Sequence, residues 1–214
     1  MPAPDFTFES LAIAEGHFPC GVDEAGRGPW AGPVVAAAVV LDARNIPSGL
    51  NDSKKLTGAR REALFGPIMV SARVGVGIVS VDVIDQINIL QATYRAMAEA
   101  VLALGTYSTF ALVDGNRTPP LNIRTQTIIK GDGKCLSIAA ASIIAKVTRD
   151  RLMIALDKEF PGYGFGRHKG YGTAEHYAAL QSIGPCAAHR KTFKPITSLT
   201  ITGQFDSRGV HEDS

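Results

Sequence analysis

The sequence lacks any long hydrophobic run and any secretory start. No apolar stretch in its 214 residues approaches the roughly 20 uncharged residues that a membrane-spanning helix needs. The first ten residues have neither the basic start nor the apolar core of a secretory signal. Internal repeats and low-complexity linkers are absent too. We therefore expect a cytoplasmic protein that does not act at a membrane.

Cysteine is scarce. The three residues Cys20, Cys135 and Cys186 are widely spaced and odd in number. That pattern excludes a disulfide framework and a zinc cluster. Buried or half-buried free thiols in a reducing compartment are the expectation.

An excess of charge of either sign is also missing. A net charge of +2 is too small to establish a polyanionic partner. Basic residues and histidines nevertheless gather among glycines and aromatic residues between 165 and 194, as a surface that binds a nucleic-acid backbone requires. A solvated basic face is the alternative interpretation of that stretch.

The chain has the length and the 45% apolar content of one packed α/β domain. We expect an N-terminal leader over residues 1–18, a compact domain with a C-terminal helical segment over 19–198, and a flexible tail over 199–214. We expect the protein to be a monomer.

Apolar runs and alternation predict strands, and a period of 3.6 residues predicts helices. The expected strands are 34–41, 73–80, 109–113 and 121–129. The expected helices are 58–70, capped by Thr57, then 81–104, 135–160, and a last one from Thr173 to 182.

Acidic residues recur where apolar strands meet glycine. Asp23 and Glu24 are adjacent and precede a glycine-rich turn, Asp114 follows the strand at 109–113, and Asp132 lies between two glycines. Ligands collect where the strands of an open sheet end, so these carboxylates can converge. Taken singly, each is equally compatible with a turn, a helix cap or an exposed acid.

Four converging carboxylates carry a formal charge of about −4, which is untenable in a dry, unneutralised site. Two divalent cations would neutralise it, and oxygen-only ligands favour Mg²⁺ or Mn²⁺ over zinc. Two such ions are a standard arrangement for displacement at phosphorus, because one activates the attacking water and the other stabilises the leaving oxygen. The acidic pattern thus predicts a two-metal phosphodiesterase.

Several blocks of sequence together resemble ribonuclease HII, the type 2 ribonuclease H. They run in the family's order from about residue 20 to 195 and cover most of the chain. The blocks are Asp-Glu-Ala-Gly-Arg-Gly-Pro (23–29), Asp-Ser-Lys-Lys-Leu (52–56), Asp-Gly-Asn (114–116), Lys-Gly-Asp (130–132), the helical block 138–150, Gly-Tyr-Gly-Thr (170–173) and His-Arg-Lys-Thr-Phe (189–193).

The resemblance implies an RNase H-like α/β fold, with a mixed central sheet flanked by helices and a small C-terminal helical region. It implies a metal-dependent endonuclease that cuts the RNA strand of RNA–DNA hybrids. It also implies nicking on the 5′ side of ribonucleotides embedded in duplex DNA, with 3′-hydroxyl and 5′-phosphate ends, as in ribonucleotide excision repair.

The resemblance also implies roles for single residues. The metal ligands and catalytic residues would be Asp23, Glu24, Asp114 and Asp132. The turn formed by Gly26, Arg27 and Gly28 would contact the 2′-hydroxyl through its backbone, since glycine allows close approach. Tyr171 would stack on the deoxyribose beyond the ribonucleotide. Lys54, Lys55 and Arg190 would contact backbone phosphates. Ser137 is expected to contact a phosphate for a separate reason: it lies near the start of the predicted helix 135–160, and helix N-termini bind phosphate.

Two other functions fit parts of the pattern. One is a two-metal phosphodiesterase of the same fold that acts on DNA, which would cut an all-deoxy duplex. The other is a non-catalytic nucleic-acid-binding domain, although such a domain gains nothing from four acids facing phosphate. Trp30 stands where the family pattern leads us to expect an aliphatic residue, and it is predicted either to pack beneath the site or to contact the minor groove.

Overall fold

The computed structural model describes residues 3–201. It divides the chain into two compact units. Within the described residues, unit 1 comprises 3–27 and 33–151, and unit 2 comprises Gly28–Gly32 and 152–201. Among the described residues, no helix is long and apolar enough to cross a membrane.

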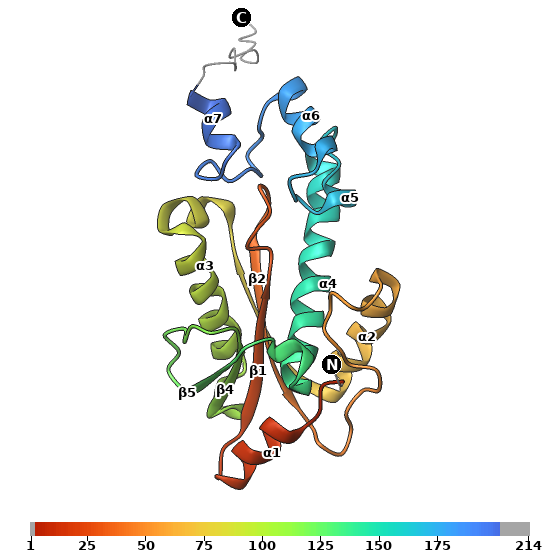
Figure 1. Cartoon of the computed structure of the whole chain (residues 1–214), viewed down its shortest axis with the longest axis vertical. Coiled ribbons are helices and arrows are strands. Elements are labelled where there is room, and N and C mark those ends of the chain that lie inside the picture. The colour runs from red at the N-terminus through yellow and green to blue at the C-terminus, as the bar shows by residue number, and fades with distance from the viewer. Residues whose placement is uncertain (1–2, 202–214) are drawn as a thin grey trace, which may run out of the picture. The chain divides into compact units, whose positions relative to one another are not determined.

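Unit 1 is built on a five-stranded sheet with the order β3-β2-β1-β4-β5 (Figure 1). The strands are β1 (Pro19–Ala25), β2 (Val34–Leu41), β3 (Ala72–Val79), β4 (Phe110–Asp114) and β5 (Arg124–Ile128). β2 pairs antiparallel with both β1 and β3, whereas β4 pairs parallel with both β1 and β5. This mixed sheet confirms the predicted fold class.

Within the described residues, unit 1 contains three α-helices and two 3₁₀ turns in addition to the first part of one long helix. They are α1 (Thr7–Ala14), α2 (Gly58–Ser71), α3 (Val81–Ala103), the 3₁₀ turn η1 (Gly105–Tyr107) and the 3₁₀ turn η2 (Gly131–Gly133). The long helix α4 (Leu136–Glu159) begins in unit 1 and ends in unit 2. The Thr57 hydroxyl accepts the Arg60 N–H, so the predicted cap of α2 is confirmed. Asn88, with φ of 65°, kinks α3, which the sequence pattern had predicted to be unbroken.

α3 and α4 cover opposite faces of the sheet (Figure 1). Glycines permit the close approach on both sides. A Cβ at Gly77 of β3 would overlap the Ala96 carbonyl oxygen of α3, and a Cβ at Gly21 of β1 would overlap the backbone at Ser137 of α4. The start of α4 therefore packs directly on β1, two residues before Asp23.

The N-terminal residues contribute a helix to unit 1. Ala12 of α1 belongs to a buried cluster that includes Phe110 and Ile138, and Phe8 packs against that cluster. The expected division into leader, domain and tail stays a prediction. Of the tail at 199–214, only residues 199–201, at the end of α7, lie within the described part of the chain.

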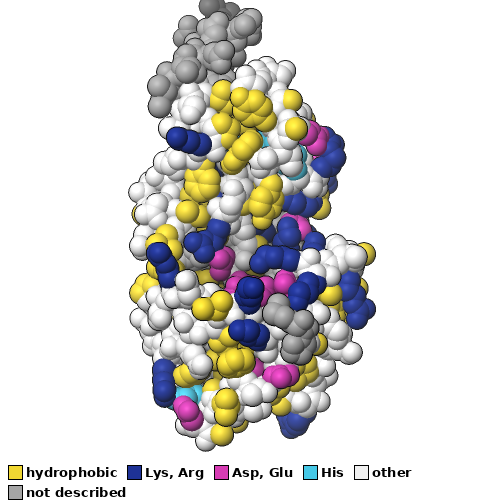
Figure 2. Space-filling view, viewed as in Figure 1, with side chains coloured by type: hydrophobic (Ala, Val, Ile, Leu, Met, Phe, Trp, Pro, Cys, Tyr) yellow, Lys and Arg dark blue, Asp and Glu magenta, His cyan; other side chains and the backbone are white. Residues whose placement is uncertain are grey.

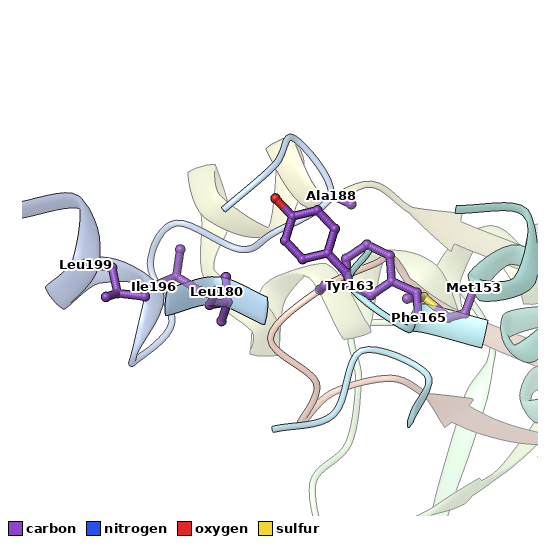
Figure 3. Close-up of a cluster of buried hydrophobic side chains, with 8 residues drawn as sticks. Met153, Tyr163, Phe165, Leu180, Ala188, Ile196 and Leu199 are labelled. Atoms are coloured by element: carbon purple, nitrogen blue, oxygen red, sulfur yellow. The ribbon is translucent and has the colours of Figure 1, made fainter. Parts of the chain in front are cut away.

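Unit 2 has its own hydrophobic core around the end of α4 (Figure 3). Its other helices are α5 (Phe165–His168), α6 (Ala174–Ile183) and α7 (Ile196–Ile201). The Tyr163 and Phe165 rings stack with centroids 5.2 Å apart and an interplanar angle of 6°. Thr173 caps α6 by accepting the His176 N–H, as predicted. Within this unit, Trp30 packs against Gly172, where a Cβ would overlap its indole.

Candidate metal centre and substrate-binding residues

The register of the sheet places two of the predicted acids side by side. β1 and β4 run parallel with Val22 opposite Val113, so Asp23 and Asp114 follow at the next step on neighbouring strands. Because side chains alternate along a strand, both carboxylates leave on the same face of the sheet. The acid pair is thus part of β1 itself and precedes the glycine-rich turn.

The third acid reaches the same place through a hydrogen bond. Asp114 Oδ1 accepts the Gly131 N–H at 2.6 Å, which ties the end of β4 to the turn η2 that carries Asp132. Asp23, Asp114 and Asp132 each offer a carboxylate oxygen, and these three atoms lie within 4.8 Å of one another. Residues from two strands and one turn, spread over more than a hundred positions, converge in one cluster.

Glu24 is placed differently from the three aspartates. It neighbours Asp23 in β1, so the pleat directs the two side chains to opposite faces. Arg27 donates to Glu24 Oε1 at 3.3 Å and forms an ion pair with it. Glu24 lies close enough to Asp114 for the two charges to interact. The structure therefore places Glu24 beside the cluster, with an arginine as its present partner.

Burial and like charges make the cluster electrostatically unfavourable without a cation. Asp23 is 6% exposed, and burial together with the charges of Glu24 and Asp114 raises its pKa well above the usual value. Burial, with the charge of Asp114, also raises the pKa of Asp132. Both shifts mean that the ionised forms lack sufficient compensating partners. An all-oxygen donor set in this condition fits a hard divalent cation.

The lysine loop between β2 and α2 reaches the same cluster. Lys54 Nζ lies 3.7 Å from Asp132 Oδ2, and Lys55 Nζ lies near Gly133 of η2. The loop is anchored by Ser53, whose Oγ accepts from the buried Ser142 hydroxyl at 2.6 Å. Figure 2 shows acidic side chains on this face of the molecule with Lys and Arg side chains next to them.

The glycine-rich turn is held at each end by a buried arginine. In unit 1, Arg149 Nε donates to the Pro33 carbonyl at 3.0 Å and packs against Gly26, where φ is +97°. In unit 2, Arg190 donates to the Gly32 carbonyl at 2.8 and 3.0 Å. Neither arginine was predicted to hold this turn, because nothing in the local sequence shows which carbonyl a distant guanidinium will meet.

Tyr171 and Gly28 are neighbours within unit 2. A Cβ built at Gly28 would lie 3.8 Å from Tyr171 Cε1, so the ring lies beside the glycine with room for about one more carbon atom between them. Tyr171 is 46% exposed, and Gly28 is exposed as well. The structure thus brings together two of the residues that the resemblance assigns to substrate binding.

Two of the predicted phosphate contacts are not at the surface. Ser137 is fully buried: its N–H donates to Glu9 Oε1 at 2.6 Å, and its hydroxyl lies 3.3 Å from Cys135 Sγ. Arg190 is equally buried, with its guanidinium directed at Gly32 and stacked on Phe193. A phosphate contact requires an accessible donor, so the structure lends no support to either role.

The predicted basic surface at 165–194 is also less basic than its sequence suggests. Arg167 forms an ion pair with Glu175, and Lys169 donates to the Gly166 carbonyl at 2.6 Å. His176 and His189 are fully buried. Charges that look alike in sequence are therefore largely engaged in holding unit 2 together.

The fold and the acidic centre define the class: a phosphodiester-hydrolysing endonuclease with an RNase H-like fold. The family model for ribonuclease HII matches residues 20–196. The chain belongs to the ribonuclease HII family, whose members act on RNA–DNA hybrids.

Relatives and solved structures agree with this assignment. A ribonuclease HII of Parvibaculum lavamentivorans is 55% identical over 201 residues, which cover 94% of this chain and 75% of the relative. One of Geobacter metallireducens is 56% identical over 193 residues, covering 89% and 91%. The RNase HII in a PCNA complex from Archaeoglobus fulgidus matches with a TM-score of 0.72 at 31% identity, covering 83% of this chain and 95% of that one.

Proposed function

We propose that Asp23, Asp114 and Asp132, with Glu24 as a fourth carboxylate, hold the divalent cations with which this endonuclease cleaves the RNA strand of RNA–DNA hybrids and nicks duplex DNA 5′ to an embedded ribonucleotide. The products would carry 3′-hydroxyl and 5′-phosphate ends. One observation carries the assignment of the site: the half-buried Asp114 and the buried Asp23 and Asp132, from β4, β1 and η2, converge with one carboxylate oxygen each within 4.8 Å of the others.

The donor set favours Mg²⁺ or Mn²⁺, because every available ligand atom is a carboxylate oxygen. Two ions would balance the charge of four carboxylates. When bound, such ions activate the attacking water and stabilise the leaving oxygen. Asp114 has a second task in this proposal, since its hydrogen bond to Gly131 holds the turn on which Asp132 is carried.

Substrate recognition is proposed for two groups of residues. The backbone of Gly26, Arg27 and Gly28 would meet the 2′-hydroxyl, and Tyr171 would stack on the next deoxyribose. The Tyr171 ring lies beside Gly28, and this proximity supports a shared task. Lys54 and Lys55 lie close to η2 and are suited to a phosphate that approaches the carboxylates.

The proposal also includes the cellular context. We expect a monomer that works in the cytoplasm on hybrids and on ribonucleotide-containing duplexes. Its three cysteines are free, as a reducing compartment allows.

Cleavage mapping tests the activity and the metal requirement together. A 5′-labelled duplex with one embedded ribonucleotide is incubated with Mg²⁺ and, separately, with a chelator. We expect one cut 5′ to the ribonucleotide with Mg²⁺ and none with the chelator. Cleavage of a matched all-deoxy duplex would instead favour a DNA nuclease of the same fold.

The Asp132→Asn variant tests the residue assignment. It removes one ligand charge while keeping the size of the side chain, so activity should fall by more than about 100-fold. The exposed Asp82→Asn in α3 is the matched control and should leave the rate unchanged. Near-normal cleavage by Asp132→Asn in Mg²⁺ would refute the proposed centre.

A further inference from the structure

Three histidines cluster in unit 2, and the proposed chemistry uses none of them. His176 and His189 are fully buried. The His168 ring stacks on His176 with centroids 4.5 Å apart and an interplanar angle of 14°. Buried imidazoles need hydrogen-bond partners for both ring nitrogens, and the identity of those partners fixes the position of each proton.

The proton of His189 can be assigned from its neighbours. The Cys186 N–H donates to His189 Nδ1 at 3.0 Å, which is shorter than the 3.3 Å from Nδ1 to the Cys186 carbonyl. Nδ1 therefore acts as an acceptor, and a neutral ring then carries its proton on Nε2. Burial, with the neighbouring His176, lowers the pKa of His189 to about 4, so the ring is neutral near pH 7.

The same order continues through His176 to the backbone of Tyr171. His189 Nε2 lies 3.0 Å from His176 Nε2, so it donates and His176 Nε2 accepts. His176 must then carry its proton on Nδ1, which lies 2.9 Å from the Tyr171 carbonyl oxygen and donates to it. A directed chain of hydrogen bonds thus runs from the Cys186 amide to the Tyr171 carbonyl.

Further backbone hydrogen bonds fix the main chain around Tyr171. The Tyr171 N–H donates to the His168 carbonyl at 3.0 Å, and Trp30 N–H donates to the Gly170 carbonyl at 2.8 Å. Thr173 N–H donates to the Tyr171 carbonyl at 2.9 Å, beside the His176 contact. The backbone is therefore fixed in several directions, while the Tyr171 ring remains 46% exposed.

We propose that His189 and His176 are positioning residues: their ordered hydrogen bonds fix the Tyr171 main chain so that its ring rejects a second 2′-hydroxyl, and they thereby set the preference for a ribonucleotide followed by a deoxyribonucleotide. This inference rests on the proposed stacking role of Tyr171. It differs from simple packing, because it depends on a donor at one particular ring nitrogen.

Two substitutions of His176 separate the nitrogens. The amide of Asn reaches the position of Nδ1 and can still donate to the Tyr171 carbonyl, whereas the amide of Gln reaches the position of Nε2 and cannot. The measured quantity is the ratio of kcat/KM on two duplexes. In one, a ribonucleotide is followed by deoxyribonucleotides, and in the other it is followed by a second ribonucleotide.

We expect His176→Gln to lower this ratio about 5- to 10-fold, the worth of one hydrogen bond, and His176→Asn to keep it within about twofold. Tyr177→Phe, at the exposed neighbouring position of α6, is the control and should leave the ratio unchanged. Equal effects of Asn and Gln, or no effect of Gln, would overturn the inference, because packing alone does not distinguish the two nitrogens.

Two further variants keep the test decisive. His189→Asn removes the donor to His176 from outside α6, and it should lower the ratio even if His176→Gln does not fold. Tyr171→Ala distinguishes the stacking role of Tyr171 from the positioning role of the two histidines. If Tyr171→Ala leaves the ratio unchanged, the stacking role itself is wrong. If Tyr171→Ala lowers the ratio but the histidine variants do not, only the positioning inference fails.

Discussion

Lys54 Nζ lies 3.7 Å from Asp132 Oδ2, so a lysine of the β2–α2 loop occupies the charge environment of the proposed metal centre. Burial lowers the pKa of Lys54, but the charges of Asp132 and Asp23 outweigh that effect and leave its pKa raised. The ammonium group thus compensates part of the acidic charge. A cation bound by Asp132 would have to compete with it.

Removal of this lysine should therefore strengthen metal binding by the free protein. Lys54→Met is expected to lower the dissociation constant for Mg²⁺ about 2- to 5-fold, since ion pairs with an exposed partner are worth about 1 kcal/mol or less. Calorimetric titration without nucleic acid measures it. Lys55→Met is the control and should have a smaller effect. Weaker Mg²⁺ binding in Lys54→Met would show that the lysine does not compete with the cation.

Asp114 is expected to have separable chemical and structural roles. Asp114→Asn and Asp114→Ala should both lose more than about 100-fold in activity, because each removes a ligand charge. Only Asp114→Ala also loses the acceptor for the Gly131 N–H, so it alone should be destabilised, by about 1–2 kcal/mol. Urea unfolding and cleavage rates measured on both variants test this. Equal stabilities would mean that the hydrogen bond to η2 contributes nothing.

Much of unit 1 follows from sequence pattern, because its elements are regular. The apolar run 34–41 coincides with β2, and the predicted helices agree with α2, α3 and α4 to within a few residues. The convergence of Asp23, Asp114 and Asp132 could be predicted as well, since each stands close to a glycine in the sequence, although β1 continues past Asp23 to Ala25. The spacing of apolar residues along a strand or a helix is a local property that the sequence displays directly.

The contacts of single polar side chains could not be predicted in the same way. The helix N-terminus rule predicts a phosphate contact for Ser137 and the family resemblance predicts one for Arg190, yet tertiary packing buries both side chains. Their partners, Glu9 and Gly32, are more than a hundred residues away in sequence. Long-range pairing of this kind leaves no local pattern, and α1 was missed for a related reason, since its eight residues carry only a weak amphipathic signal.

Long-range hydrogen bonds also anchor the N-terminal segment, and Glu9 of α1 makes two of them. Its Oε1 accepts the Ser137 N–H at 2.6 Å and the Cys135 thiol at 3.2 Å, while Asp5 hydrogen-bonds to Lys134 and Leu136 on either side. Glu9→Ala leaves the buried amide without an acceptor and should cost about 1–3 kcal/mol of unfolding free energy.

Glu9→Gln is the matched variant, because its amide oxygen can still accept from Ser137, and it should retain most of the stability. Since the anchored segment adjoins η2, Glu9→Ala should also weaken Mg²⁺ binding, measured by calorimetry below the unfolding transition. Wild-type stability and metal affinity in Glu9→Ala would show that α1 does not support the Asp132 turn.

His189 should make the stability of the protein depend on pH in a defined window. Its pKa is about 4 in the folded protein, where burial disfavours the charged form, and about 6.5 when unfolded. Below pH 6.5 the unfolded chain gains a proton that the folded ring does not take up until pH 4. The stabilising contribution is therefore fully present above pH 6.5 and is lost as the pH falls to 4, with a limit of about 3 kcal/mol.

A comparison with His189→Gln isolates this contribution from those of the carboxylates, which both proteins share. The difference in unfolding free energy between wild type and His189→Gln, measured by urea denaturation, should shrink steadily from pH 7 to pH 5. The wild type loses stability over that interval because its unfolded state binds one more proton than that of the variant. A difference that stays constant over this range would mean that His189 titrates alike in the folded and unfolded states. That result would contradict a ring that stays neutral in the fold between Cys186 and His176.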